Sequence, residues 1–242
     1  MKLLLILPAY NEEKSIRSTV KQITDFQQTE FPELTIDYII INDGSTDRTA
    51  AICAENGFPC LTLIQNLGIG GAVQTGYRYA HTKGYDIAVQ FDGDGQHDIN
   101  SLSDLIRPII NGQADFTVGS RFLDKSAGFR STFFRRVGIR HLSAVLRLFS
   151  GLKILDVTSG YRAANKEVLS YLAKTYPADY PEPESLAYLQ KNGFRIQEVQ
   201  ANMFERTGGQ SSIRAWKTVY YMIKVSLAIV CACIQKKERY CK

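Results

Sequence analysis

Short apolar runs alternate with longer amphipathic segments over the first half of the chain. The apolar runs have the length of buried strands and cover residues 2–8, 36–42, 60–65, 86–91 and 115–120. The segments between them space their apolar residues as helices do and cover 12–26, 45–57, 69–84 and 101–112. This rhythm predicts an α/β fold, with a mostly parallel sheet and helices on both faces.

The second half is less regular. It predicts helices over 135–151 and 180–193, a strand over 194–200, and a polar loop over 205–212. Residues 156–172 are interpreted as a loop that leads into a helix. The tail after residue 215 is apolar and then basic.

Polar clusters follow four of the predicted strands, and they read PAYNEE, NDGSTD, NLGIGG and DGDGQHD. In parallel sheets, ligands bind beyond the carboxyl ends of the strands. We therefore expect the four clusters to form one site at one edge of the sheet.

Two carboxylates stand in the last cluster, at Asp92 and Asp94. Mg²⁺ or Mn²⁺ prefers oxygen ligands and shares them with substrate phosphates. Gln96 or His97 could complete such a site, and Asp98 is interpreted as the cap of the next helix. The alternative is an acidic surface turn, since Asp and Gly are common in turns.

The other clusters carry weaker signals. Asp43 could accept hydrogen bonds from a nucleobase or a ribose, or it could cap the next helix. For Asp47, capping of that helix is the favoured role. Ser45 or Thr46 is predicted to be that helix's N-cap. NLGIGG lacks the third glycine of a dinucleotide-binding loop, because Val73 stands there, and packing at a helix start is the favoured role.

Composition limits the remaining classes of function. The chain has 242 residues and a formal net charge of +5, which does not establish nucleic-acid binding, and no nucleic-acid partner is expected. The five cysteines form no CxxC pair, which indicates reduced thiols and no zinc site. The apolar start is too short for a signal peptide, and no run reaches the roughly 20 residues of a membrane span.

Taken together and in order, PAYNEE, INDGSTD, NLGIGGA, FDGDGQHD, GSR and DVTSGYRA resemble the motifs of family 2 glycosyltransferases. The similarity is greatest to the polyprenol-phosphate glycosyltransferases, represented by dolichol-phosphate mannose synthase. It covers residues 3 to about 215. The resemblance implies a GT-A fold over 1–215, a nucleotide-sugar donor linked to UDP, GDP or dTDP, and Mg²⁺ or Mn²⁺ as cofactor.

The resemblance also implies roles for single residues. The nucleotide-sugar would be bound by Pro8, Ala9, Tyr10, Glu12, Asp43, Gly70, Asp92 and Arg206. The metal would be held by Asp92, Asp94 and Gln96. The acceptor phosphate would lie near Arg121, Ser159 and Ser211. The loop ends Ser211-Ser212 where the family often has Ser-Lys, so one expected cation is missing.

The acceptor decides whether a base is needed. We expect inverting transfer of a hexose to a polyprenyl phosphate, which is already ionised; the alternative is a sugar hydroxyl on a lipid-linked or cell-surface glycan, which needs a general base. Catalytic candidates are Asp94, Glu182 and Asp156. Glu182 could instead stabilise a helix start, and Asp156 could orient an arginine. A non-enzymatic alternative is a nucleotide-sugar-binding adaptor.

The tail over 216–242 is interpreted as a basic amphipathic helix. Such a helix is typical of a membrane surface, and the basic residues between Arg121 and Arg147 favour the same interpretation. The alternative is packing on the domain or against a second copy in a homo-oligomer. The expected location is cytoplasmic and peripheral, at the inner face of the membrane.

Overall fold

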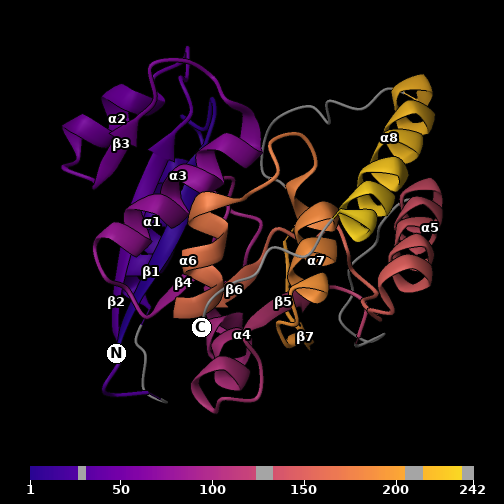
Figure 1. Cartoon of the computed structure of the whole chain (residues 1–242). Coiled ribbons are helices and arrows are strands. Elements are labelled where there is room, and N and C mark those ends of the chain that lie inside the picture. The colour runs from indigo at the N-terminus through magenta and orange to yellow at the C-terminus, as the bar shows by residue number, and fades with distance from the viewer. Residues whose placement is uncertain (27–30, 124–132, 205–214, 236–242) are drawn as a thin grey trace.

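The computed structural model describes residues 1–26, 31–123, 133–204 and 215–235. Within them one sheet runs in the order β3-β2-β1-β4-β6-β5-β7 (Figure 1). Its strands are β1 (Lys2–Ala9), β2 (Thr35–Asn42), β3 (Cys60–Thr62), β4 (Ile87–Gln90), β5 (Phe116–Ser120), β6 (Arg162–Asn165) and β7 (Ile196–Gln200). The helices are α1 (Ile16–Asp25), α2 (Thr49–Glu55), α3 (Gly68–Thr82), α4 (Leu102–Ile110), α5 (Phe133–Ser150), α6 (Lys166–Lys174), α7 (Pro181–Lys191) and α8 (Ala215–Ile234), with a 3-10 turn, η1 (Ile99–Ser101), before α4.

The sheet is mostly parallel, as predicted. Strand β1 pairs in parallel with β2 and β4, β2 with β3, and β5 with β7. Strand β1 is buried from Leu3 to Ala9, which explains its unbroken apolar sequence: a central parallel strand has helices on both sides.

Strand β6 departs from the sequence prediction. We expected a loop leading into a helix over 156–172, but Arg162–Asn165 forms a strand antiparallel to both β4 and β5. Its sequence RAAN contains no β-branched or aromatic residue, so local propensity does not indicate a strand. The two neighbouring strands, which bury it from Arg162 to Ala164, make it one.

Two apolar layers cover the sheet, one on each face. Leu4 and Ile6 of β1 face the layer built with α3, α5, α6, α7 and α8. Leu3, Leu5 and Leu7 face the layer built with α1, α2 and α4. The alternation along β1 follows from the two-residue repeat of a strand, and it confirms the predicted helices on both faces.

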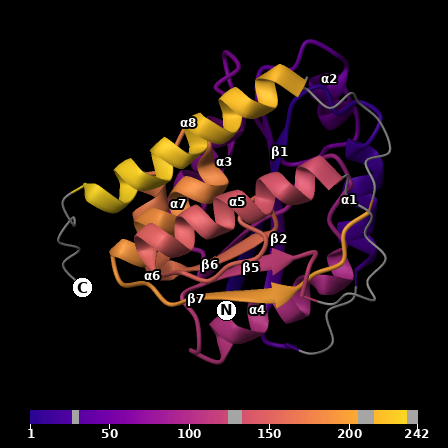
Figure 2. The ribbon, with the colours of Figure 1, turned by 90° about the vertical axis from the view of Figure 1, so that its right-hand side faces the viewer.

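Helix α8 packs along α5 and α7 on the outside of one layer (Figure 2). Val225, Ile229 and Ala232 are fully buried against the core, so one face of the predicted tail helix is part of the domain. Among the described helices, none combines the length and the hydropathy that crossing a bilayer requires.

Candidate active site

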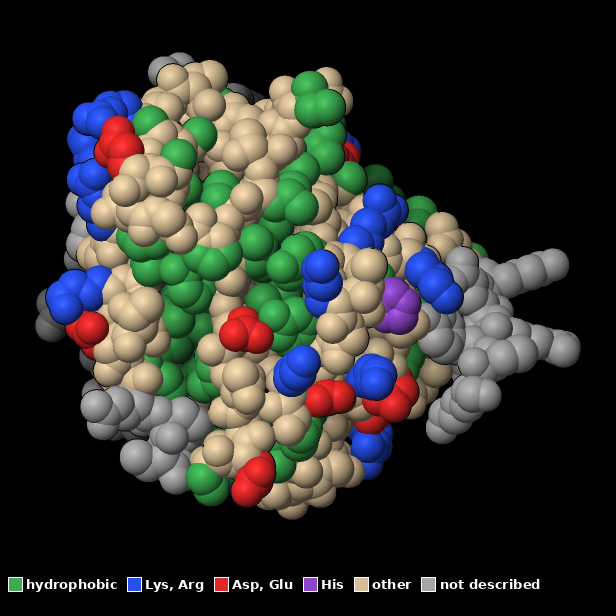
Figure 3. All heavy atoms as spheres, turned by 90° about the vertical axis from the view of Figure 1, so that its left-hand side faces the viewer, with side chains coloured by type: hydrophobic (Ala, Val, Ile, Leu, Met, Phe, Trp, Pro, Cys, Tyr) green, Lys and Arg blue, Asp and Glu red, His purple; other side chains and the backbone are tan. Residues whose placement is uncertain are grey.

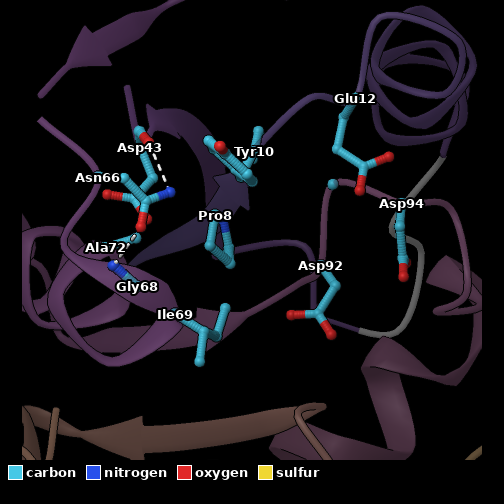
Figure 4. Close-up of a pocket in the computed structure, with 12 residues that line it drawn as sticks. Pro8, Tyr10, Glu12, Asp43, Asn66, Gly68, Ile69, Ala72, Asp92 and Asp94 are labelled. Carbon is cyan, nitrogen blue, oxygen red and sulfur yellow. Dashed lines mark hydrogen bonds between the residues drawn. The ribbon is translucent and has the colours of Figure 1, made fainter. Parts of the chain in front are cut away.

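The loops that follow β1, β2, β3 and β4 meet at one edge of the sheet, as the sequence predicted, and enclose a pocket (Figure 4). The pocket is lined by Pro8, Ala9, Tyr10, Glu12, Asp43, Asn66, Gly68, Ile69, Ala72, Asp92, Gly93 and Asp94. Its volume of about 360 Å³ lies within the range of small-molecule sites, roughly 300–1,000 Å³.

Polar groups stand at both ends of this pocket. Asp43 and Asn66 lie at one end, and Asp92, Asp94 and Glu12 lie at the other. Pro8 and Tyr10 lie between the two groups, and Tyr10 is 48% exposed. The arrangement provides hydrogen-bonding groups at one end, an exposed aromatic ring in the middle, and carboxylates at the other end.

Asp43 joins three elements at its end of the pocket. Its backbone N–H donates to the Ala9 carbonyl (2.9 Å), and its Oδ1 accepts from the Leu67 N–H (2.7 Å) just before α3. The Asn66 side chain donates to the Asp43 carbonyl (3.1 Å). The carboxylate is therefore fixed in direction, and it does not cap α2.

The N-cap position of α2 is Arg48, so the predicted N-caps Ser45 and Thr46 are wrong, and the favoured Asp47 lies one residue before the N-cap but still bonds to the first turn. Asp47 Oδ1 accepts from the Thr49 N–H (2.8 Å) at the start of the helix. Asn11 holds this loop beside the one after β1, because its Oδ1 accepts from the N–H groups of Thr46 and Asp47 (2.8 and 3.3 Å). Asn11 has a φ of 57°, a left-handed conformation that Asn tolerates better than most residues.

The loop after β4 presents its two carboxylates through a tight turn. Gly95 has a φ of 76°, and Asp94 Oδ1 accepts from the Gln96 N–H (3.0 Å) across the turn. Asp92 Oδ1 accepts from the Gln90 side chain (3.2 Å). Gly160 packs so closely that a Cβ there would lie 2.9 Å from Asp92 Oδ2. The direction of the Asp92 carboxylate is therefore set by its neighbours.

His97 is buried and contacts this loop. Its Nδ1 accepts from the Asp92 N–H (3.0 Å), its Nε2 lies 3.6 Å from Asp92 Oδ2, and its ring stacks on Tyr161 with centroids 4.6 Å apart. Burial lowers the pKa of His97 to about 4, so the ring is neutral near pH 7. Asp98, which was expected to cap the next helix, caps the 3-10 turn η1 that leads into α4 by accepting from the Asn100 N–H (3.0 Å).

The donor set fits a divalent cation that is shared with a ligand. Within the described residues, no group of three or more His, Cys, Asp and Glu side chains is arranged to hold a metal. Asp92 and Asp94 offer two carboxylates at an open pocket, and Mg²⁺ or Mn²⁺ typically takes one or two carboxylates together with substrate phosphates. Gln96 lies outside the pocket lining, and its side-chain amide is directed to the Phe204 carbonyl (3.5 Å).

Arg121 and Asp156 form a buried ion pair, and Arg121 lies within electrostatic reach of His97. Nε and Nη2 of Arg121 each lie 2.7 Å from a different oxygen of Asp156, and both side chains are almost inaccessible to solvent. The carboxylate of Glu198 accepts from the N–H groups of Leu155 and Asp156 (2.8 and 2.7 Å). In this arrangement Asp156 orients an arginine, as in the alternative role considered from the sequence.

Ser159 is buried on the same segment, where its Oγ accepts from the Tyr161 N–H (3.3 Å). Its carbonyl accepts from Nε of Arg162 (2.6 Å). Arg162 also donates to the carbonyls of Val157 and Glu182 (3.1 and 2.7 Å). This buried guanidinium, which the sequence did not single out, joins the segment before β6 to the start of α7.

Glu182 lies in the first turn of α7. Burial raises the pKa of Glu182, the Arg162 guanidinium opposes this rise, and the Asp92 carboxylate adds to it. Glu182 therefore lies within electrostatic reach of the pocket, although it does not line it.

The remaining predicted residues lie elsewhere. Gly70 of α3 faces the loop before α7: a Cβ there would lie 2.3 Å from the carbonyls of Pro177 and Ala178. This contact agrees with the packing role favoured for the NLGIGG cluster. Gly70 does not line the pocket, whereas the neighbouring Gly68, Ile69 and Ala72 do. Arg206 and Ser211 lie outside the described residues.

The residues that the sequence did not single out include Asn11, Asn66, Ile69 and Ala72. Asn66 and Ile69 stand within or beside the NLGIGG cluster, which was recognised as following a strand, so position after a strand end was the available signal. Ala72 and Ile69 are apolar and carry no chemical signal of their own. Only the folded structure, in which they line the pocket, reveals them as pocket residues.

Comparisons with known proteins agree with this geometry. The sequence model of Glycosyl transferase family 2 matches residues 4–172. A UDP-N-acetylglucosamine–dolichyl-phosphate N-acetylglucosaminyltransferase of Methanococcus voltae is 34% identical over 81% of this chain and 82% of its own length. A polyprenol monophosphomannose synthase of Mycolicibacterium smegmatis is 27% identical, over 92% and 85%.

The fold has close counterparts among solved structures. Glucosyl-3-phosphoglycerate synthase from Mycobacterium tuberculosis, crystallised with Mn²⁺, UDP-glucose and phosphoglyceric acid, superposes with a TM-score of 0.72. The match covers 96% of this chain and 79% of that one at 21% identity, and it shows a common fold. The chain therefore belongs to glycosyl transferase family 2, and it is a glycosyltransferase with the GT-A fold.

Proposed function

We propose that this enzyme transfers a hexose, with inversion, from a nucleotide-sugar to a polyprenyl phosphate at the cytoplasmic face of a membrane. The observation that carries the proposal is the division of the pocket, with Asp43 and Asn66 at one end and Asp92 and Asp94 at the other. A nucleoside would take the first end and a diphosphate the second. The named activities of the dolichyl- and polyprenyl-phosphate relatives support a lipid phosphate acceptor.

Asp92 and Asp94 would hold Mg²⁺ or Mn²⁺ at the diphosphate end. Such an ion neutralises the charge that develops on the leaving diphosphate. Glu12 and the Gly93 backbone line the same end, so the carboxylates stand where phosphate oxygens can complete the coordination. The nucleobase remains open among uracil, guanine and thymine.

The acceptor phosphate would lie near Arg121 and Ser159. The Arg121 guanidinium is held by two bonds to Asp156, which removes most of its freedom before a phosphate arrives. A fixed guanidinium loses less rotational entropy when it binds an anion than a free one does. A lipid phosphate is already ionised near pH 7, so this reaction needs no general base.

A screen of donors tests the proposal. UDP-glucose, UDP-N-acetylglucosamine, GDP-mannose and dTDP-glucose are offered with Mg²⁺ or Mn²⁺ and undecaprenyl phosphate in detergent, and lipid-linked sugar is measured. We expect one donor to give product that disappears when EDTA is added. Transfer to a glycan acceptor with no transfer to the lipid phosphate would refute the proposed acceptor.

A second candidate is transfer to a sugar hydroxyl of a lipid-linked or cell-surface glycan. The raised pKa of Glu182, to which the Asp92 carboxylate contributes, favours this candidate because a general base works best with a pKa near the working pH. Glu182→Gln separates the two. Turnover within about threefold of wild type supports the phosphate acceptor, whereas a loss of about 100-fold or more supports a base.

A further inference from the structure

The outer face of α8 is an apolar stripe that no described part of the chain covers. Its exposed residues recur three or four positions apart, so they lie on one side of the helix, opposite the buried Val225, Ile229 and Ala232. They are Tyr220, Ile223, Lys224, Leu227, Cys231 and Ile234. The exposed fractions of Ile223 and Leu227 are both 59%, and that of Ile234 is 74%.

The outer face of α5 continues this stripe and adds positive charge. Arg136, Arg140 and Arg147 are exposed along one edge, and Val137 and Leu148 are exposed beside them, Leu148 to 78%. The faces adjoin where His141 Nε2 and Ser226 Oγ lie 3.0 Å apart. Figure 2 shows the two helices side by side across the same side of the molecule.

The charge on this paired surface has one sign. The sequences of α5 and α8 contain no Asp or Glu. The described acid that reaches the stripe is Asp179, which pairs with Lys224 (3.2 Å) and leaves the three arginines of α5 in excess. On the opposite side of the molecule, by contrast, Lys and Arg lie among Asp and Glu (Figure 3).

A partner for this surface must accept apolar side chains and carry negative charge. A second copy of the chain meets the first requirement but would bring its own three arginines to the same contact. An anionic bilayer meets both, because apolar side chains enter the boundary of the acyl chains while arginines remain at the headgroups. Each basic residue near such a surface adds attraction.

We propose that the outer faces of α5 and α8 together bind an anionic lipid bilayer, with both helices lying in its interface. The inference extends the proposed function, which requires access to a lipid acceptor, and names the surface that provides it. Helix α5 follows β5 in the chain, and α8 follows β7. Strands β5 and β7 run parallel to each other and end at Ser120 and Gln200. Arg121, the residue assigned to the acceptor phosphate, directly follows β5 and precedes α5 in the chain.

Vesicle sedimentation tests the proposal without any acceptor. The full chain is mixed with vesicles of phosphatidylcholine alone or with 30% phosphatidylglycerol, both free of polyprenyl phosphate. We expect binding to the anionic vesicles that weakens as salt rises. Replacing Arg136, Arg140 and Arg147 together by Gln should weaken it on the order of 100-fold, and Leu227→Glu should weaken it by roughly 10-fold or more.

Matched controls lie on the other side of the molecule. Arg17, Lys21 and Arg48, replaced together by Gln, remove the same charge, and Ile64→Glu changes a fully exposed apolar residue. The Ile64 variant should bind as wild type, and the triple control should lose less than threefold. Thermal melts verify that every variant is folded.

Three results would overturn the proposal. One is equal binding to both vesicle types, and another is binding that the α5 and α8 variants leave unchanged. The third is light scattering that shows a dimer which Leu227→Glu dissociates, with vesicle binding unaffected. Because the vesicles contain no acceptor, these results are independent of whether the enzyme uses a lipid phosphate.

Discussion

The first and second halves of the chain use charged side chains in opposite ways. In the first half, Asp43, Asp92 and Asp94 follow strand ends and face an open pocket. In the second half, Arg121, Asp156 and Arg162 are buried and make several bonds each within the protein. The pocket carboxylates line the space in which we propose that a ligand binds, whereas the buried charges hold loops together.

This difference predicts different consequences of mutation. Removal of a pocket carboxylate should affect the reaction far more than stability. Removal of a buried charge should affect stability first, because an unpaired buried charge is left behind. The experiments below test where this distinction holds.

Asp94→Asn should have the largest effect. It removes one of the two carboxylates that we propose hold the cation, and we expect transfer to fall by about 1,000-fold or more while the free energy of unfolding changes by less than about 1 kcal/mol. Initial rates at several Mn²⁺ concentrations and urea unfolding measure the two quantities. Asp98→Asn, in the same loop but used as a cap, is the control: it should keep most of the activity, and a similar loss there would refute the assignment.

Asp156→Asn should have the next largest effect, on stability. The change leaves the buried Arg121 without its counter-charge, so the free energy of unfolding should fall by about 3–5 kcal/mol. Urea unfolding measures this loss. Asp25→Asn, which breaks an exposed pair with Lys21, is the control and should cost no more than about 0.5 kcal/mol. A loss below 1 kcal/mol for Asp156→Asn would mean that the pair is not needed to hold the loop.

Gly70→Ala should have an intermediate effect on both quantities. The added methyl group meets two backbone carbonyls, which cannot turn away as a side chain can, so we expect a loss of about 1–3 kcal/mol. Because Ile69 and Ala72 line the pocket on the same helix, affinity for UDP or GDP should also fall, which calorimetry can measure. Gly138→Ala is the control, since its methyl group meets only the end of Met222, and it should be neutral or stabilising. Equal behaviour of the two variants would exclude a packing role for Gly70.

Glu182→Gln should have the smallest effect, visible as a pH dependence. Burial raises the pKa of Glu182 in the folded protein above its usual value of 4.5, so the unfolded chain ionises first as the pH rises. Stability is therefore lost between pH 4.5 and the folded-state pKa, and Gln avoids this loss. The stability of the variant minus that of wild type should therefore be larger at pH 7.5 than at pH 4.5. Urea midpoints of both proteins at both pH values measure this difference. A difference that does not vary with pH would contradict the raised pKa.

The sequence predicted the first half well because its signals are local. Unbroken apolar runs such as KLLLILPA, each followed by a polar cluster, suffice to predict a parallel sheet and to place Asp43, Asp92 and Asp94 at one edge. Boundaries were less accurate: the first helix was predicted from residue 12 but begins at Ile16, and the third strand ends at Thr62 rather than at 65. Asn11 was not identified, because its role depends on contact with a loop more than thirty residues away.

The second half was predicted less well because its structure depends on distant partners. Strand β6 exists because β4 and β5 lie on either side of it, and Arg162 is tolerated in the interior because three carbonyls accept hydrogen bonds from it. Neither condition is visible in RAAN itself. That Asp156 orients an arginine was foreseen only as an alternative, and Arg121 was not named as its partner, since residue type does not distinguish a catalytic carboxylate from one that orients an arginine.

The place of β6 in the sheet has a consequence for synthesis on the ribosome. Strand β5 leaves the ribosome long before β6, yet it joins β4 only through β6 and pairs in parallel with the still later β7. The nascent chain must therefore keep an apolar strand unpaired while α5 is made, and contacts between such distant segments form slowly. Until β6 is inserted, β5 offers two open edges to other chains, so this interval is when aggregation is most to be expected.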